Sequence, residues 1–347
     1  MRFKYCLRLD FRGNKRIGGR GNPELLSHPS FRFKAESSSS TTTTTRSFRG
    51  SSLADPHKVP PTIRLAMPAN QTMSSPRIIL ITGANSGVGL ATTEVLTTTP
   101  ATNFHVKMTG RSLSKLDQAR TDLIARHPNT TDISSRLTTC HLDVLDDASI
   151  QSALTTISSR FGHLDALINN AAIGNSSDNV RDRFTACLET NVTGAAVVAE
   201  RFRPLLLLRK TEAENESKPY SIYVSSGAGS FARTGGYHTS RPSTGGLPSP
   251  PPPPSPRNPD AYHASKAALN MVALLEHRAH GHEINVFVMT PGFVVSNLRG
   301  TDENLRTWAG MAGDLMVAGR TLLSILQGER DADAGAGLVH KDGVFGW

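Results

Sequence analysis

Short apolar runs and amphipathic stretches alternate along the chain from Arg77 to the C-terminus. The first run, Ile78-Ile79-Leu80-Ile81, is continuously apolar, as expected for a strand buried on both faces of a sheet. The pattern predicts further strands at about residues 104–108, 137–142, 164–168, 221–224, 284–289 and 337–340. It predicts a helix after the first strand, a helix around Tyr262, and helices at about residues 112–126, 146–161, 183–208 and 313–326.

The alternation of strands and helices predicts the fold class. Parallel strands need crossover connections, and right-handed helical crossovers cover both faces of the sheet. We therefore expect an α/β fold: a single Rossmann-type, doubly wound parallel sheet of about seven strands with helices on both faces. The predicted domain covers residues 74–347.

One segment, residues 233–260, interrupts the alternation. It is rich in Pro, Gly, Ser and Thr, with an unbroken run from Pro250 to Pro254. Such a composition is typical of a loop with polyproline II character. Two interpretations stay open: a surface insertion without consequence, or a rim or lid of the site, because Tyr262 follows it directly.

Residues 1–73 differ in composition from the rest of the chain. They contain a Ser/Thr run at residues 37–45 and many Arg and Lys, without a sustained hydrophobic period. This predicts a disordered leader. Three interpretations compete: a solvated tail, a mis-assigned start with the true one at Met73, or an organellar transit peptide. The first two favour a cytoplasmic protein, and the third a mitochondrial one.

The charge distribution limits the partners of the predicted domain. The chain of 347 residues has a net charge of +9. Residues 1–73 hold 13 Lys and Arg against 4 Asp and Glu, whereas the remainder holds 25 of each sign. A neutral domain argues against nucleic acid as its partner, and a leader-directed nucleic-acid or membrane association is the weaker alternative. No run of 18 apolar residues predicts a membrane span, and the three separated cysteines predict neither disulfides nor a metal site.

A glycine-rich turn joins the first strand to the first helix. In this context Gly83 suits a tight turn, Gly87 a close approach of the backbone to a pyrophosphate, and Gly89 close packing of the helix on the sheet. The N–H groups and positive dipole end of the helix would hold the phosphates. The sequence therefore predicts a nucleotide site, with a plain structural turn as the alternative. The turn also contributes these residues to the predicted site: Asn85, Ser86 and Val88.

The end of the second strand indicates which dinucleotide is bound. In this fold it lies beside the adenosine ribose, where an acidic residue would accept hydrogen bonds from the 2′-hydroxyl of NAD. Here no acid is present, and Arg111 is placed to pair with a 2′-phosphate. The prediction is NADP(H) over NAD(H), with a surface arginine as the alternative.

Tyr262 and Lys266 are the candidate proton-transfer pair. Four residues apart on a helix, they share one face, and an ammonium beside a phenol favours the phenolate. Such a tyrosine can exchange a proton with a carbonyl or alcohol oxygen near neutral pH. The alternative is an exposed helix face with a solvated lysine.

In this combination the chain resembles the short-chain dehydrogenase/reductase family, from about Arg77 to the C-terminus. The further segments that match the family pattern are His141-Leu142-Asp143-Val144, Leu167-Ile168-Asn169-Asn170-Ala171-Ala172, Thr190-Asn191-Val192-Thr193-Gly194, Val224-Ser225-Ser226-Gly227 and Thr290-Pro291-Gly292-Phe293-Val294-Val295-Ser296. The resemblance implies cofactor contacts from Tyr262 and Lys266 and from these positions: Asp143, Val144, Asn170, Ala171, Pro291, Gly292, Val294 and Ser296. The C-terminal residues and the long spacer before Tyr262 look most like carbonyl-reductase-type members.

The resemblance also implies a reaction, in which hydride passes between a nicotinamide and a carbonyl carbon. Tyr262 would be the acid in reduction and the base in oxidation, with Lys266 lowering its pKa. Ser226 would hydrogen-bond the substrate oxygen, and Asn191 would hold a water that links Lys266 to solvent. A non-catalytic NADP(H)-binding regulator of the same fold is the alternative. The small-molecule substrate and the choice between monomer and homo-oligomer stay open.

Overall fold

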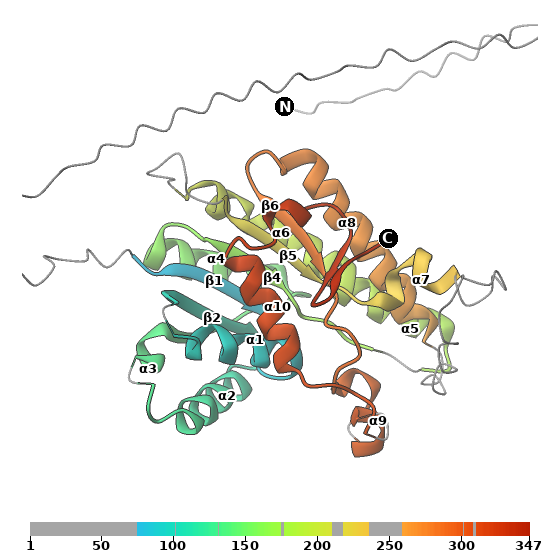
Figure 1. Ribbon diagram of the computed structural model, residues 1–347, viewed down its shortest axis with the longest axis horizontal. Coiled ribbons are helices and arrows are strands. Elements are labelled where there is room, and N and C mark those ends of the chain that lie inside the picture. The colour runs from blue at the N-terminus through green and yellow to red at the C-terminus, as the bar shows by residue number, and fades with distance from the viewer. Residues whose placement is uncertain are drawn as a thin grey trace, which may run out of the picture. The chain divides into compact units, whose positions relative to one another are not determined.

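An eight-stranded sheet in the order β3-β2-β1-β4-β5-β6-β7-β8 forms the centre of the molecule (Figure 1). The structure is a computed structural model. It describes residues 75–100, 102–130, 132–174, 177–209, 218–235, 259–300, 302–307 and 310–347. The predicted leader and residues 236–258 of the predicted Pro-rich loop lie outside the described residues.

The strands run parallel from β3 to β7, and β8 is antiparallel to β7. Their bounds are β1 (Arg77–Thr82), β2 (Phe104–Gly110), β3 (Leu137–His141), β4 (Ala166–Asn169), β5 (Tyr220–Val224), β6 (Asn285–Met289), β7 (Leu338–His340) and β8 (Gly343–Phe345). The strand order reverses between β1 and β4, which is the switch point where ligands of open α/β sheets bind. The predicted doubly wound fold is confirmed, and the antiparallel β8 is an addition to it.

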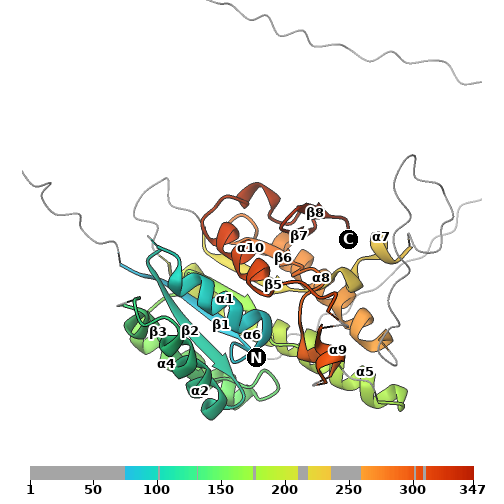
Figure 2. The same ribbon diagram turned by 60° about the horizontal axis from the view of Figure 1, so that its bottom comes forward.

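Helices cover both faces of the sheet. One face carries α1 (Gly87–Thr98), α2 (Leu113–Arg126) and α10 (Met316–Leu326), and the other carries α4 (Asp147–Phe161), α6 (Gly194–Leu207) and α8 (Asp260–His280). On the first face α1 and α10 lie side by side (Figures 1 and 2). The shorter helices are α3 (Ile133–Arg136), α5 (Val180–Leu188), α7 (Phe231–Gly235) and α9 (Glu303–Thr307).

The continuous apolar run of β1 has a direct structural cause. Successive side chains of a strand point to opposite faces. Ile79 and Ile81 therefore enter the core under α1 and α10, while Ile78 and Leu80 enter the core under α6 and α8. A strand that serves two cores has no polar face.

The predicted single helix over residues 183–208 is wrong in detail. The structure has α5, then a turn of π-helix at Glu189–Thr193, and then α6. Asn191 lies in this π turn and is 1% exposed. Single π turns inside helices occur often at functional sites.

A buried carboxylate fastens α8 to the sheet. Glu276 is 6% exposed and accepts hydrogen bonds from Ser221 and Tyr223 of β5, both at 2.7 Å. Arg203 of α6 pairs with it at 3.2 Å. The helix that carries Tyr262 is thus fixed to the strand that leads to Ser226.

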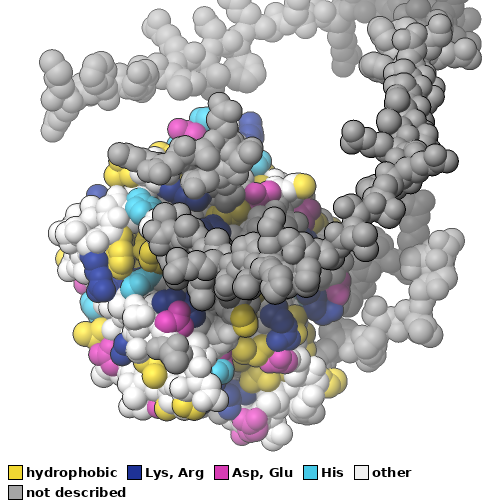
Figure 3. All heavy atoms as spheres, turned by 60° about the vertical axis from the view of Figure 1, so that its left-hand side comes forward, with side chains coloured by type: hydrophobic (Ala, Val, Ile, Leu, Met, Phe, Trp, Pro, Cys, Tyr) yellow, Lys and Arg dark blue, Asp and Glu magenta, His cyan; other side chains and the backbone are white. Residues whose placement is uncertain are grey.

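The surface carries charges of both signs. On the face shown in Figure 3, basic and acidic side chains lie interspersed with apolar ones. Among the described helices, none combines the length and apolar composition that a membrane crossing requires.

Candidate active site

The glycine turn after β1 leaves no room for a side chain at two of its three glycines, Gly83 and Gly89. A Cβ on Gly83 would lie 2.9 Å from the Ala171 backbone, and Gly83 has a φ of 65°. A Cβ on Gly89 would lie 2.6 Å from the Gly83 carbonyl oxygen. Gly87 also has a positive φ, 56°, but a Cβ there would meet nothing within 4 Å. The backbone is therefore tightly packed at Gly83 and Gly89, whereas the space next to Gly87 is free.

The end of β4 holds this turn in place. Asn170 donates its side-chain N–H to the carbonyl oxygens of Thr82 and Gly83, at 2.8 and 3.1 Å. The Thr82 hydroxyl accepts the backbone N–H groups of Asn170 and Ala171, at 2.9 and 3.0 Å. Asn170 and Ala171 therefore lie beside the glycine turn, where the resemblance places them, and they act on its backbone.

The remaining residues of the turn face the start of α1. Ser86 is the N-cap of α1 in extended conformation, and within the described residues its side chain makes no cap hydrogen bond. The first N–H groups of a helix, here from Gly87 and Val88 onward, have no partner inside the helix. These N–H groups begin at Gly87, where an added Cβ would meet nothing within 4 Å, and such a helix start suits an anion.

Arg111 stands directly after β2 and is exposed. The Asn85 side-chain oxygen lies near Gly110, 3.6 Å from the position of a Cβ on that residue. Arg111, Asn85 and the glycine turn thus meet at the carboxyl ends of β1 and β2. No acidic residue stands between Met108 and Ser112.

Asp143 and Val144 follow β3 at the same edge of the sheet. The Asp143 carboxylate accepts the Leu145 N–H at 3.1 Å, and its backbone N–H donates to Ser149 at 2.9 Å. Val144 packs against Gly194, where a Cβ would lie 2.9 Å from the Val144 carbonyl oxygen. Both residues are half-buried and lie in a loop that these contacts define.

Ser226 and Tyr262 meet although 35 residues separate them in the chain. Ser226 follows β5, and its oxygen accepts the Ala228 N–H at 3.1 Å. Its hydroxyl also hydrogen-bonds to the phenol of Tyr262, which lowers the pKa of that phenol. Burial outweighs this effect and raises the pKa of Tyr262 to about 12.

Lys266 lies beside the ring of Tyr262, with 5.7 Å from its Nζ to the ring centroid. The ammonium is buried and donates to the Val224 carbonyl oxygen at 2.9 Å. Burial lowers the pKa of Lys266 to about 8. The pair shares one helix face as predicted, but the net direction of the Tyr262 pKa is opposite to the expected lowering, because removal from water dominates.

Asn191 connects three parts of the site. Its side-chain oxygen accepts the Ile173 N–H at 2.8 Å, and its amide donates to the Ile173 carbonyl oxygen and to the Ser265 hydroxyl, both at 2.9 Å. Ile173 lies in the segment after β4, and Ser265 precedes Lys266 on α8. The side chain of Asn191 is thus occupied in joining the π turn, the end of β4 and α8.

The segment after β6 contains the last group of predicted residues. Pro291 is half-buried and Gly292 has a φ of 78°, with His340 2.8 Å from the position of a Cβ. Val294 is 7% exposed and forms a bridge with Gly313. Ser296 accepts the Leu298 N–H at 3.1 Å. This segment runs from the carboxyl end of β6 toward Arg299, whose charge acts on Tyr262.

The start of α8 is held by an ion pair that the sequence did not reveal. Arg183 of α5 is 7% exposed and binds the Asp260 carboxylate through two hydrogen bonds, Nε to Oδ1 at 2.8 Å and NH2 to Oδ2 at 2.7 Å. It also donates to the carbonyl oxygens of Ser177 and Asp178. The only sequence signal was an acidic residue at a helix start, which also has a simple dipole explanation.

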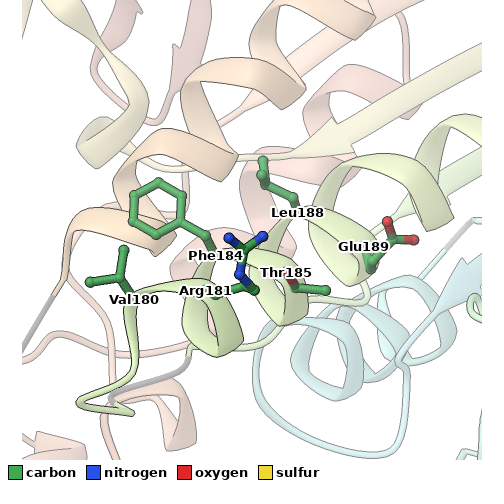
Figure 4. Close-up of a pocket in the computed structure, with 6 residues that line it drawn as sticks. All are labelled: Val180, Arg181, Phe184, Thr185, Leu188 and Glu189. Carbon is green, nitrogen blue, oxygen red and sulfur yellow. The ribbon is translucent and has the colours of Figure 1, made fainter.

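A hollow of about 480 Å³ lies away from these residues. It is lined by residues of α5 and the π turn: Val180, Arg181, Phe184, Thr185, Leu188 and Glu189 (Figure 4). None of the predicted site residues lines it. We therefore place the candidate site at the carboxyl edge of the sheet and not in this hollow.

Comparison with known proteins shows the family. The model of the short chain dehydrogenase family matches residues 77–245. The short-chain dehydrogenase/reductase tropE of Talaromyces stipitatus is 31% identical over 279 residues, which cover 78% of this chain and 97% of that protein. The chain belongs to the short-chain dehydrogenase/reductase family. A second member, eupG of a Phoma species, is 30% identical over 73% of this chain and 91% of its own length.

Solved structures of the family place the chain more closely. The NADPH-bound carbonyl reductase from chicken fatty liver is 25% identical, with a TM-score of 0.61, and the match covers 79% of this chain and all of that one. The carbonyl reductase Sniffer of Drosophila melanogaster shares the fold, with a TM-score of 0.59. The chain is thus a carbonyl-reductase-like member of the short-chain dehydrogenase/reductase family, an oxidoreductase family whose members bind a nicotinamide cofactor.

Proposed function

We propose that the protein is an NADP(H)-dependent oxidoreductase that interconverts an aldehyde or ketone and an alcohol, with Tyr262 as general acid and base. The observation that carries this proposal is the meeting of Ser226 and Tyr262 beside buried Lys266, at the sheet edge that also holds the glycine turn. A cofactor-binding protein without chemistry has no need for a hydroxyl, a phenol and a buried ammonium grouped at this position.

The residues of the glycine turn fit a dinucleotide. A pyrophosphate would fit the free space next to Gly87, at the first N–H groups of α1. The Ser86 hydroxyl, which makes no cap hydrogen bond, would add a donor. The proposal assigns contacts on the adenine side to Asp143 and Val144. It assigns contacts beside the glycine turn to Asn170 and Ala171. It assigns the nicotinamide end to Lys266 and to the segment of Pro291, Gly292, Val294 and Ser296.

The choice of NADP(H) rests on Arg111. Its exposed guanidinium follows β2, and an arginine fork suits a 2′-phosphate. The NADPH-bound state of the similar chicken reductase agrees with this choice. A matched test is Arg111→Asp, which should weaken NADPH binding and favour NADH.

The bound nicotinamide would supply or accept the hydride. For reduction, Tyr262 is suited to act as the acid, because a pKa of about 12 keeps its proton in place at neutral pH. Ser226 would donate a hydrogen bond to the substrate oxygen and stabilise the charge that develops there. Lys266, with a pKa of about 8, would exchange protons near neutral pH and carry positive charge beside the phenol. Asn191 would hold the π turn and α8 in fixed relative positions through its hydrogen bond to Ser265.

The proposed catalytic unit is residues 74–347, and the substrate is a small molecule. Deletion of residues 1–72 should leave turnover unchanged if the leader has no part in catalysis. A targeting role of the leader predicts that the same deletion changes the location of the protein in the cell and leaves its turnover unchanged.

The test is NADPH oxidation by the purified protein with a panel of aldehydes, ketones and quinones, followed at 340 nm. Turnover with any of these carbonyl compounds, and a preference for NADPH over NADH, is the expected result. NADPH binding without turnover across the whole panel would favour the non-catalytic regulator instead.

A further inference from the structure

Three polar residues form a stripe along α8. Tyr262, Lys266 and Asn270 follow one another at intervals of four residues, so they lie on one face of the helix, about one turn apart. The proposed chemistry uses the first two and assigns nothing to Asn270, which is only 5% exposed. Because buried polar groups in folded proteins are hydrogen-bonded, the partners of this amide indicate what it does.

Asn270 holds both ends of the turn that carries Ser226. Its side-chain oxygen accepts the Ser225 hydroxyl at 2.6 Å, and its side-chain N–H donates to the Gly229 carbonyl oxygen at 3.1 Å. Ser225 and Gly229 are buried, whereas Ser226 between them is half-exposed. One amide thus fixes the residue before Ser226 and the residue that ends the 3-10 turn after it, Gly229.

The same turn also rests directly on the backbone of α8. A Cβ on Gly229 would lie 2.5 Å from the backbone carbonyl carbon of Lys266 and 2.6 Å from the backbone nitrogen of Ala267. A side chain at position 229 would therefore push the turn away from the helix. The close approach brings the turn against α8 at Lys266, one helical turn before Asn270.

A further contact holds the middle of the turn. The Gly227 N–H donates to the hydroxyl of Thr290, which follows β6, at 3.1 Å. Within the turn, the Ser226 oxygen accepts the Ala228 N–H at 3.1 Å. The turn is thus tied to the end of β6 in its middle and to α8 at both ends. Among these contacts, the two to α8 come from the single side chain of Asn270.

We propose that Asn270 is a positioning residue that fixes the Ser226 hydroxyl relative to the Tyr262 phenol and the Lys266 ammonium. The inference rests on the proposed function, in which Ser226 and Tyr262 both act on the substrate oxygen. One oxygen can accept from both hydroxyl groups only when their separation is fixed, and a misplacement of about 1 Å can cost roughly 10²-fold in rate. Asn270 joins the turn of Ser226 to the helix of Tyr262 in one unit.

The first test compares two variants in carbonyl reduction with NADPH. Asn270→Leu removes both hydrogen bonds at similar volume, and kcat should fall roughly 10- to 100-fold while the Kd for NADPH is unchanged. Ser225→Ala removes one bond to Asn270 and keeps the bond to Gly229, so kcat should fall by a smaller factor. This milder variant decides the case if Asn270→Leu does not fold. A wild-type kcat in either folded variant would overturn the proposal.

Ser221→Ala is the matched control for Ser225→Ala. It removes another buried hydroxyl that joins β5 to α8, through a hydrogen bond to Glu276 at 2.7 Å. Ser221 lies near the start of β5, and Ser226 follows its end. Turnover per folded molecule should therefore stay at the wild-type level. An equal loss of kcat in Ser221→Ala and Ser225→Ala would overturn the proposal, because any lost contact between β5 and α8 would then act alike.

The third measurement needs no turnover. In crystal structures, the distance between Ser226 Oγ and Tyr262 Oη should be longer in Asn270→Leu than in wild type by about 0.5 Å or more, with Lys266 in place. Ser225→Ala should show a smaller change in the same direction. An unchanged distance, or an equal displacement of Lys266, would overturn the role of Asn270. A longer distance in a protein that reduces no carbonyl compound would contradict only the proposed function.

Discussion

The cofactor turn and the proton-transfer group are built in different ways. The turn after β1 uses glycines within seven consecutive residues, Gly83 to Gly89, and is held by Asn170 and Ala171 at the end of β4. The proton-transfer group takes Ser226 from the end of β5, Tyr262 and Lys266 from α8, and support from Asn191 in the π turn. The first depends on the absence of side chains, and the second depends on side chains that hold distant elements together.

This difference indicates how each region fails. A single methyl group added at Gly83 or Gly89 meets backbone atoms, which cannot move aside easily. The proton-transfer group is instead sensitive to the clamps that fix α8, the Arg183–Asp260 pair at its start and Glu276 toward its end. Substitutions in the two regions should therefore separate cofactor binding from turnover.

Gly83→Ala should have the largest effect on cofactor binding. A φ of 65° is strained for alanine, and its Cβ would lie 2.9 Å from the Ala171 backbone. Strain of about 1–3 kcal/mol corresponds to roughly 5- to 150-fold weaker NADPH binding in a fluorescence titration. Gly162→Ala is the control, since it has a φ of 75° with nothing within 4 Å and lies at the end of α4. Equal NADPH affinity in Gly83→Ala and wild type would contradict this account of the turn.

Asp260→Asn should reduce turnover roughly tenfold while NADPH binding is kept, because a small displacement of Tyr262 costs rate. Arg183 lowers the pKa of Asp260 to about 2. The pair therefore stabilises the fold above the ordinary pKa of about 4, and this stabilisation is lost as the pH falls toward about 2. The stability difference between wild type and variant should shrink over that range. Asp132→Asn, which breaks the similarly half-exposed pair with Arg136 away from the candidate site, is the control for both measurements.

Glu276→Gln should affect stability more than chemistry. The variant leaves Ser221, Tyr223 and Arg203 around a neutral amide in place of a carboxylate. We expect the free energy of unfolding to fall by about 1–3 kcal/mol in urea denaturation, with turnover per folded molecule unchanged. Glu200→Gln, an exposed site on α6, should cost nothing measurable. A loss of turnover without a loss of stability would show that Glu276 acts on the site directly.

Lys266→Met tests the smallest effect, the pH dependence of stability. Burial lowers the pKa of Lys266 to about 8, below its ordinary value, so the unfolded chain binds more protons between that value and about 10.4. Wild-type stability should therefore rise relative to Lys266→Met above pH 8, by on the order of 1 kcal/mol per pH unit at most. Urea unfolding at pH 7.5 and 9.5 measures this. Lys115→Met, at an exposed lysine of α2, is the control for the loss of a lysine side chain.

Sequence patterns were sufficient where structure is set locally. The buried strands, the glycine turn and the shared face of Tyr262 and Lys266 follow from periodicity and spacing over a few residues. The carboxyl ends of parallel strands lie on the same edge of the sheet. The strand assignments alone therefore place four features on that edge: the glycine turn, Arg111, Asp143 and Ser226.

The rest depends on contacts between distant segments. The π turn interrupts a stretch that is helical by local pattern, and its side-chain partners Ile173 and Ser265 lie far away in the chain. Arg299 likewise donates to the carbonyl oxygens of Val294 and Arg306, on both sides of it in the chain, which its spacing alone does not predict. The raised pKa of Tyr262 also needed the structure, because spacing shows the neighbouring ammonium but not the loss of water.

The most direct test of the account is Tyr262→Phe. The variant removes one oxygen and keeps the ring beside Lys266, so NADPH affinity should stay close to that of wild type. Turnover of carbonyl substrates should fall by roughly 10²–10⁴-fold, the range that a positioned general acid contributes. Wild-type turnover in Tyr262→Phe, measured together with unchanged NADPH binding, would contradict the assignment of Tyr262 as the proton donor.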